Sequence, residues 1–243
     1  MEIDIIFLVA LFLVAFIYSA VGHGGASGYL ALMALFGIST IFMRASALTL
    51  NLFVSAVSFY AFYRAGHFKI KILIPFIIGS VPLAFIGARI IIDPQIFKYI
   101  LGVFLIFAVA RMLFSPKEKE KAVISFNFSI AIIIGAFLGF FSGLIGIGGG
   151  IILSPVLLLL GWTNVKETAA ISAIFIFVNS ASGLLGLIST GIHLSPNLIY
   201  WVVIAFTGGL AGAYVGSSRM SLKKLKYLLA FVLFLASIKL LFV

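Results

Sequence analysis

Two runs of glycine carry the chemistry that this sequence most clearly offers. The string GLIGIGGGIILSP, residues 143–155, holds five glycines in eight positions, and a looser run, GHGG, occupies residues 22–25. Glycine inside a helix costs about 1 kcal/mol relative to alanine, so such runs indicate breaks in helical segments. A helix that begins after a break presents unpartnered backbone N–H groups and about half a positive charge. Because glycine has no Cβ, an anion can approach those groups closely, and both runs therefore predict anion binding by backbone amides.

Small polar side chains accompany both glycine runs. A serine follows each run, and serine and asparagine residues recur on the next long apolar segment of the chain. Such side chains can hydrogen-bond an anion without adding charge to an apolar region. The candidate substrate-binding residues are Gly22, His23, Gly24, Gly25, Ser27, Asn51, Ser55, Gly146, Gly148, Gly149, Gly150, Ser154, Ser172 and Asn179.

Structural interpretations compete with these functional ones. Glycines in membrane helices often serve close packing, as we expect for Gly208, Gly212 and Gly216. Consecutive glycines point in different directions around a helix and form no packing stripe, which favours substrate lining for the two runs. His23 either hydrogen-bonds an anion or donates a proton, or it caps a buried carbonyl, and the sequence leaves both open. Arg44 is expected to anchor a helix end rather than to gate a pore.

Composition argues against several other chemistries. The chain has no cysteine, and its three histidines lack metal-ligand spacing, so we expect no metal site and no cofactor. Neither glycine run follows a soluble strand or precedes Gly-Lys-Ser/Thr, which argues against nucleotide binding. The six acidic residues lie at segment edges or in loops, which leaves no intramembrane carboxylate for a proton relay or sodium site. We therefore expect a non-enzyme, with transport that is facilitated or coupled through His23 or the substrate's own proton.

The elements that must position these residues are membrane helices. Of 243 residues, 64% are hydrophobic and 9% are charged, and the mean hydropathy is +1.33. The net charge of +10 is typical of basic loops on a membrane protein, so no nucleic-acid partner is expected. The N-terminal stretch carries Glu2 and Asp4 before any basic residue, which favours a first membrane helix over a signal peptide. We predict an all-α polytopic bundle of ten segments, at about 3–21, 25–38, 44–64, 70–90, 95–114, 123–142, 150–161, 167–188, 197–218 and 222–242.

The ten segments divide into two similar halves. At a shift of 124 residues, Gly22, Gly24 and Gly25 fall on Gly146, Gly148 and Gly149. Five segments per half is an odd number, so the second half must be inverted in the membrane. The predicted parts are a first inverted repeat at 1–114, a hydrophilic cytoplasmic linker at 115–122 and a second inverted repeat at 123–243.

The loop charges predict the orientation. If 25–38 and 150–161 each return the chain to the side it came from, one set of loops carries twelve lysines and arginines and the other carries four. The positive-inside rule then places both termini outside the cell. The four basic residues on the outer side are Arg44, Arg89, Lys98 and Lys239.

The segments that follow the glycine runs are too short to span a bilayer. At 1.5 Å per residue each covers roughly 18–21 Å, against a hydrocarbon core of about 30 Å. We therefore expect each to begin within the membrane, with its N-terminus lining a buried or wet cavity. In inverted halves, two such N-termini would converge on one anion near the midplane, which is where inverted-repeat transporters place their sites.

The string GLIGIGGGIILSPVLLLLG, together with its degenerate partner AVGHGGASGYLALMALFG, resembles the TauE/SafE family of sulfite and organosulfur anion exporters. The resemblance covers length, central linker and duplicated halves. The first half departs from the pattern, since His23 and Ser27 interrupt the glycines and Ala31 stands where Pro155 falls. The resemblance implies a multi-pass permease of the bacterial or archaeal plasma (inner) membrane that moves sulfite, sulfonates, sulfoacetate or related small anions.

Other functions remain open at this point. The chain could carry another small anion or a neutral metabolite, or it could be a non-transporting membrane assembly factor. An intramembrane enzyme is disfavoured, because His23 is the one histidine near the glycines and no acid joins it. The expected partners are a small anionic substrate and the lipid bilayer, with a homodimer possible.

Overall fold

The computed structural model describes residues 5–113, 125–192, 194–217 and 223–242, and this part of the chain folds into helices without a strand. Each predicted segment corresponds to one helix, and within the described residues five helices (α3, α4, α6, α8 and α9) are long and apolar enough to cross a membrane. The chain is therefore a polytopic helical membrane protein, as predicted. The helices are α1 Ile5–Ala20, α2 Ala26–Leu35, α3 Thr40–Arg64, α4 Ile70–Arg89, α5 Pro94–Leu113, α6 Phe128–Ile145, α7 Gly150–Leu159, α8 Val165–Ile188, α9 Leu198–Ser217 and α10 Lys223–Phe242.

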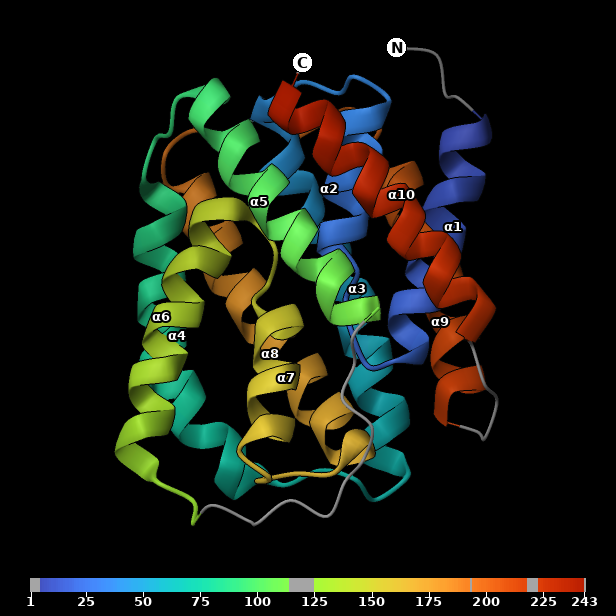
Figure 1. The fold of residues 1–243 in the computed structure, drawn as a ribbon. Coiled ribbons are helices and arrows are strands. Elements are labelled where there is room, and N and C mark those ends of the chain that lie inside the picture. The colour runs from blue at the N-terminus through green and yellow to red at the C-terminus, as the bar shows by residue number, and fades with distance from the viewer. Residues whose placement is uncertain (1–4, 114–124, 193, 218–222, 243) are drawn as a thin grey trace.

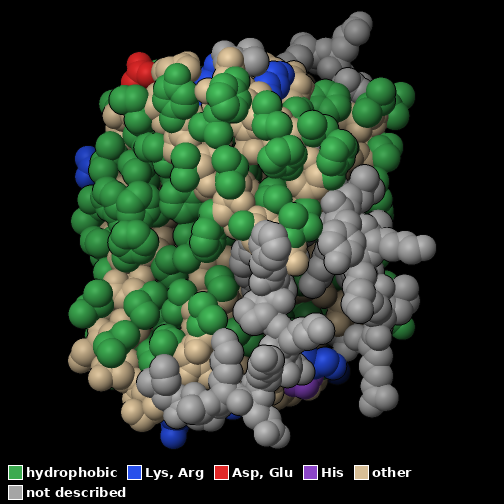
Figure 2. Space-filling view, viewed as in Figure 1, with side chains coloured by type: hydrophobic (Ala, Val, Ile, Leu, Met, Phe, Trp, Pro, Cys, Tyr) green, Lys and Arg blue, Asp and Glu red, His purple; other side chains and the backbone are tan. Residues whose placement is uncertain are grey.

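The surface has the polarity of a protein embedded in a bilayer. Apolar side chains cover the middle of the face seen in Figure 2, and lysine and arginine side chains lie at its two ends. Several large apolar side chains point outward, among them Ile133, which is 69% exposed. Such exposure is unfavourable in water but favourable against lipid tails.

The helix pairings of the two halves match. α4 packs against α6 and α9 against α1, which is the same pairing with the halves exchanged, while α3 meets α8 and α5 meets α10. From the middle of the bundle, α2 runs toward one end and α7 toward the other (Figure 1). The first turn of α1 and the last turn of α10 lie at the same end. The whole linker at 115–122 lies outside the described residues, so the division into two repeats at 1–114 and 123–243 stays a prediction.

Glycines bring the paired helices into backbone contact. On α9, a Cβ added at Gly208, Gly212 or Gly216 would collide with a backbone carbonyl of α1. On α6, a Cβ at Gly139 or Gly143 would collide with the backbone of α4 in the same way. The packing role predicted for Gly208, Gly212 and Gly216 is confirmed, because each leaves room for the neighbouring backbone.

Both short helices end in the same motif. After α2, Gly37 has a φ of +70° and Ile38 N donates to Met33 O. After α7, Gly161 has a φ of +67° and Trp162 N donates to Leu157 O. A left-handed glycine followed by such a bond is the Schellman termination, and these two glycines are 124 residues apart, as the repeat requires.

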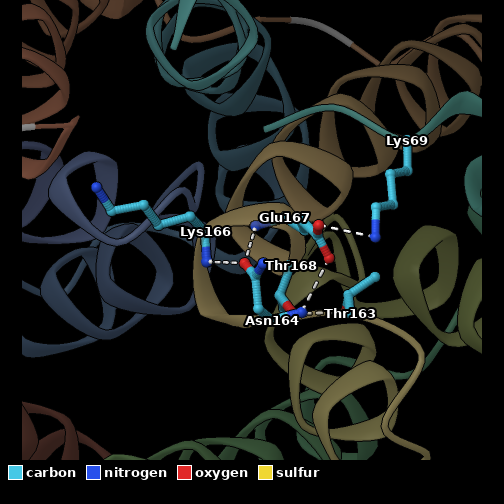
Figure 3. Close-up of polar contacts among 6 residues, drawn as sticks. All are labelled: Lys69, Thr163, Asn164, Lys166, Glu167 and Thr168. Atoms are coloured by element: carbon cyan, nitrogen blue, oxygen red, sulfur yellow. Dashed lines mark hydrogen bonds and ion pairs between the residues drawn. The ribbon is translucent and has the colours of Figure 1, made fainter. Parts of the chain in front are cut away.

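Side-chain caps set two helix starts. α6 begins at Phe128 rather than near 123, because the Asn127 side chain accepts a hydrogen bond from Ile130 N at 3.0 Å. α8 begins with a reciprocal pair, in which Asn164 accepts from Glu167 N and Glu167 accepts from Asn164 N. Glu167 also forms an ion pair with Lys69 at 2.8 Å, which ties the second half to the loop between α3 and α4 (Figure 3).

Candidate functional site

The two glycine breaks converge on the same pair of side chains. A Cβ added at Gly24 would collide with Asn51 Oδ1 and lie 2.9 Å from Ile176 Cγ2. A Cβ added at Gly148 would lie 2.6 Å from Asn51 Nδ2 and 2.9 Å from Ile176 Cγ2. Asn51 is on α3 and Ile176 on α8, so the long central helix of each half meets both breaks. Glycine is needed at both positions because no other residue leaves this space.

Backbone conformation explains further glycines of the breaks. Gly25 and Gly149, which directly precede α2 and α7, have φ values of +99° and +74°. This left-handed region is costly for residues with a Cβ. At each break the chain reverses direction within the bundle, so that α2 and α7 begin in the middle of the bundle (Figure 1).

Asn51 caps the first of the two short helices. Its Oδ1 accepts a hydrogen bond from Ala26 N at 3.0 Å, and its Nδ2 donates to Ser180 Oγ at 3.3 Å. Ala26 is the first residue of α2, so Asn51 occupies the position at which an anion would meet the helix end. At α7 the preceding residue, Gly149, has no side chain to cap the helix, and the Ser154 hydroxyl donates to the carbonyl of Gly150, the first residue of α7.

His23 joins the first break to the second short helix. Its ring is 7% exposed, with Nδ1 3.0 Å from Val21 O and Nε2 2.9 Å from Ser154 Oγ. Ser154 Oγ also lies 2.8 Å from Ser172 Oγ on α8. The contact to Val21 shows that His23 does cap a backbone carbonyl, and the contact to Ser154 adds a polar link between the halves. Whether the ring also meets an anion stays a prediction.

The remaining candidates are buried nearby but face other partners. Ser27 Oγ lies 2.6 Å from Tyr18 OH, and Ser55 Oγ donates to Asn51 O within its own helix. Asn179 Nδ2 donates to Phe175 O at 2.8 Å, while its Oδ1 is buried without a partner in the described structure. Added Cβ atoms at the other glycines would first meet Ala169 (from Gly22), Tyr29 (from Gly25), the Arg44 backbone (from Gly146), Phe175 (from Gly149) and Ile176 (from Gly150).

Sequence reasoning missed two residues of this centre. Ile176 contacts three of the glycines but is apolar, so a search for polar side chains could not find it. Ser180 is the hydrogen-bond partner of Asn51 and lies 129 residues after it. The repeat shift of 124 in this part of the chain pairs Asn51 with Phe175, so the repeat gave no signal for Ser180.

The groups that meet at this centre carry dipoles rather than fixed charge. Of the side chains that meet there, only His23 can ionise near neutral pH. The N-termini of α2 and α7 supply partial positive charge, and the serine and asparagine side chains supply hydrogen bonds. In the described part of the chain, no three His, Asp or Glu side chains gather where they could hold a metal ion.

Comparison with known proteins identifies the family. The profile described as "Sulfite exporter TauE/SafE" matches residues 7–240, nearly the whole chain. This chain belongs to the TauE/SafE family. A "probable membrane transporter protein", y4hK of Sinorhizobium fredii, is 35% identical over 237 residues, which is 96% of each chain. Two relatives come from Bacillus subtilis. The probable membrane transporter protein YunE is 27% identical, and the match covers 78% of this chain and 76% of YunE. The probable membrane transporter protein YdhB is 26% identical, and the match covers 88% of this chain and 89% of YdhB.

No solved structure matches the chain. The family and the names of these relatives make this TauE/SafE member a multi-pass membrane transporter.

Proposed function

We propose that this protein is a permease that exports small sulfur-containing anions, of the sulfite, sulfonate or sulfoacetate class, by alternating access. The observation that carries the proposal is the convergence of both glycine breaks on Asn51 and Ile176, with a helix beginning at each break. Helix N-termini stabilise anions through free amides and the helix dipole. The family description, which names sulfite, supports the substrate class.

The Asn51 side chain indicates how the anion binds. Its Oδ1 accepts from Ala26 N, which is the bond that a sulfite or sulfonate oxygen would accept. We infer that the anion replaces Asn51 at the start of α2 and also binds at the start of α7. All the glycines of both breaks are buried, so helices must move before an anion can reach them. This is the behaviour that alternating access requires.

The proposed driving force is electrical. With the cell interior negative, moving one negative charge outward is favoured by about 2.3 kcal/mol per 100 mV. Export of an anion therefore needs no further energy source, and the protein needs no catalytic reaction. The orientation belongs to the same proposal: a bacterial or archaeal plasma membrane, with both termini and the end that carries Arg44 outside. A homodimer stays a prediction.

Flux measurements with the purified protein in liposomes test the substrate class. We expect sulfite, sulfoacetate and thiosulfate to cross, faster when the potential favours anion exit, and glycerol to be excluded. Flux of glycerol alone would overturn the proposal and favour a permease for neutral metabolites. Absence of flux for every solute would favour a non-transporting assembly factor.

A matched pair of glycine variants tests the site. Gly148 and Gly66 both have positive φ, +73° and +78°, so alanine costs about 1 kcal/mol of backbone strain at either position. A Cβ at Gly66 meets nothing within 4 Å, whereas a Cβ at Gly148 meets Asn51 and Ile176. We expect Gly148→Ala to lose most of the sulfite flux and Gly66→Ala to keep it. Equal flux in the two variants would place the anion elsewhere.

A further inference from the structure

Four cations gather around two adjoining pockets at one end of the bundle. One pocket, of about 340 Å³, is lined by Arg44 and Arg89, and the other, of about 320 Å³, by Lys98 and Lys239. The two pockets share Thr40 and Pro94 in their walls, so they adjoin. These cations are the four that the positive-inside rule leaves on the outer side, where basic residues are otherwise sparse.

Arg44 is buried in the wall of the larger pocket and has no acidic partner among the described residues. Its side chain is 9% exposed and donates to three carbonyls, those of Ala88 at 2.9 Å, Gly143 at 3.0 Å and Ile90 at 3.3 Å. These bonds anchor the end of α4, as expected from the sequence. Its Nε is buried and has no hydrogen-bond partner within the described residues. The carbonyls solvate the guanidinium but do not neutralise its charge.

No carboxylate compensates these cations in the described part of the chain. The ion pair found there joins Lys69 and Glu167 near the opposite end. Asp93 is close in sequence, but its Oδ1 accepts from Gln95 N and Ile96 N at the start of α5, and it lines neither pocket. The pockets therefore carry net positive charge, and the ligand chemistry they suit is anionic.

Arg44 also connects the larger pocket to the second glycine break. Its NH2 group binds the carbonyl of Gly143 in the last turn of α6. A Cβ added at Gly146, where the break begins, would lie 3.2 Å from Arg44 Cα. One residue thus lines the outer pocket and packs on the break, which places the pocket next to the proposed central site.

We propose that this pocket is a second anion site, in which Arg44 and Arg89 hold the oxyanion group of the substrate on the outer side of the glycine breaks. The inference rests on the proposed function, because it assigns the next position of the same anion. A guanidinium binds oxyanions through paired N–H groups, and a pathway with more than one moderate site lets an ion leave as well as enter.

Binding of sulfoacetate to the purified full-length protein tests this site. We expect Arg89→Gln to weaken binding about tenfold, the effect of losing one charge-assisted hydrogen bond. Lys71 is an exposed cation at the start of α4, at the opposite end of the bundle. Lys71→Gln is therefore the matched control, and it should bind sulfoacetate as the wild type does. Arg44→Gln should weaken binding further. Because Arg44 also donates to three carbonyls, its replacement could disturb folding, and the test therefore relies on Arg89. The Arg89 guanidinium lies over the Phe85 ring. Equal affinity of Arg89→Gln and wild type overturns the site.

Flux measurements, and binding measurements in two lipid compositions, distinguish failure of this inference from failure of the proposed function. Wild-type sulfoacetate flux without Arg89-dependent binding overturns the second site and leaves the proposed function standing. Absence of wild-type flux for all sulfur anions overturns the proposed function, and the exit role of the pocket with it. A lipid phosphate offers similar oxyanion chemistry, so binding is repeated in bilayers of phosphatidylcholine and of phosphatidylglycerol. Loss of binding in phosphatidylglycerol would assign the pocket to a headgroup and overturn the proposal.

Discussion

At the scale of single residues, Ser154 connects His23 to α7, so protonation of His23 can change a hydrogen bond of that helix. Val21 O only accepts hydrogen bonds, so Nδ1 of His23 must carry a hydrogen. Ser154 has one hydrogen and three neighbours, His23 Nε2, Gly150 O and Ser172 Oγ. A neutral ring requires Ser154 to donate to Nε2, whereas a charged ring donates to Ser154 and frees its hydrogen for Gly150 O. Proton uptake would therefore turn one hydroxyl at the first turn of α7.

This arrangement predicts that any proton coupling passes through His23. In liposomes with a pH gradient and no membrane potential, we expect His23→Gln to abolish the gradient-driven part of sulfite flux. Flux driven by potential alone should remain, because the helix N-termini do not titrate. Gradient-driven flux equal to that of the wild type would show that the proton travels with the substrate instead.

At the scale of elements, the two short helices reach from the middle of the bundle to its opposite ends. α2 and α7 have ten residues each, which is about 15 Å, or half of a hydrocarbon core of about 30 Å. Their starts differ, since Asn51 accepts a hydrogen bond from the first amide of α2, whereas at the first residue of α7 the Ser154 hydroxyl donates to the Gly150 carbonyl. The two half-sites are therefore similar in backbone but unequal in hydrogen bonding.

The unequal caps predict unequal effects of two asparagine substitutions. Asn51→Ala removes bonds to Ala26 N and Ser180 Oγ, whereas Asn179→Ala removes one bond within α8 and an unpaired buried oxygen. We expect Asn51→Ala to lower the free energy of unfolding by about 1–3 kcal/mol and Asn179→Ala by less. Thermal unfolding in detergent measures the difference. A larger loss for Asn179→Ala would mean that Asn51 does not hold the start of α2.

At the scale of the whole molecule, the halves are tied at both ends by contacts between distant parts of the chain. Lys69 pairs with Glu167 near one end, and Arg44 binds Gly143 O toward the other. Each contact joins the first half to the second. In the proposed alternating access, motion that exposes the centre to one side would loosen the contact on that side.

The absence of cysteine from the chain makes the orientation directly testable. Gln95 and Lys166 are exposed, and they lie in the two sets of loops that the charge count separates. In intact cells, a membrane-impermeant maleimide should label Gln95→Cys and leave Lys166→Cys unlabelled until the membrane is permeabilised. The positive-inside rule is the physical reason, since the loop that carries Lys166 belongs to the basic set. The reverse labelling pattern would invert the proposed topology and place the Arg44 pocket in the cytoplasm.

Much of this architecture is encoded locally. In the described part of the chain, the ten helices and the breaks before α2 and α7 follow from runs of apolar residues and the glycines that interrupt them. Hydrophobic length and glycine content act over a few turns of chain, so the sequence alone determined the class of protein and the position of each break.

Only the tertiary structure decided which side chains meet at the breaks. His23 reaches Ser154, 131 residues away, while Ser27 turns instead toward Tyr18 on α1. Ile176 and Ser180 join the centre although neither stood out in the sequence. The direction in which a side chain points depends on how each helix is rotated against its neighbours. In a chain that is apolar on nearly every helix face, no periodicity of charge or hydrophobicity specifies that rotation, and the packing of glycines against backbone fixes it.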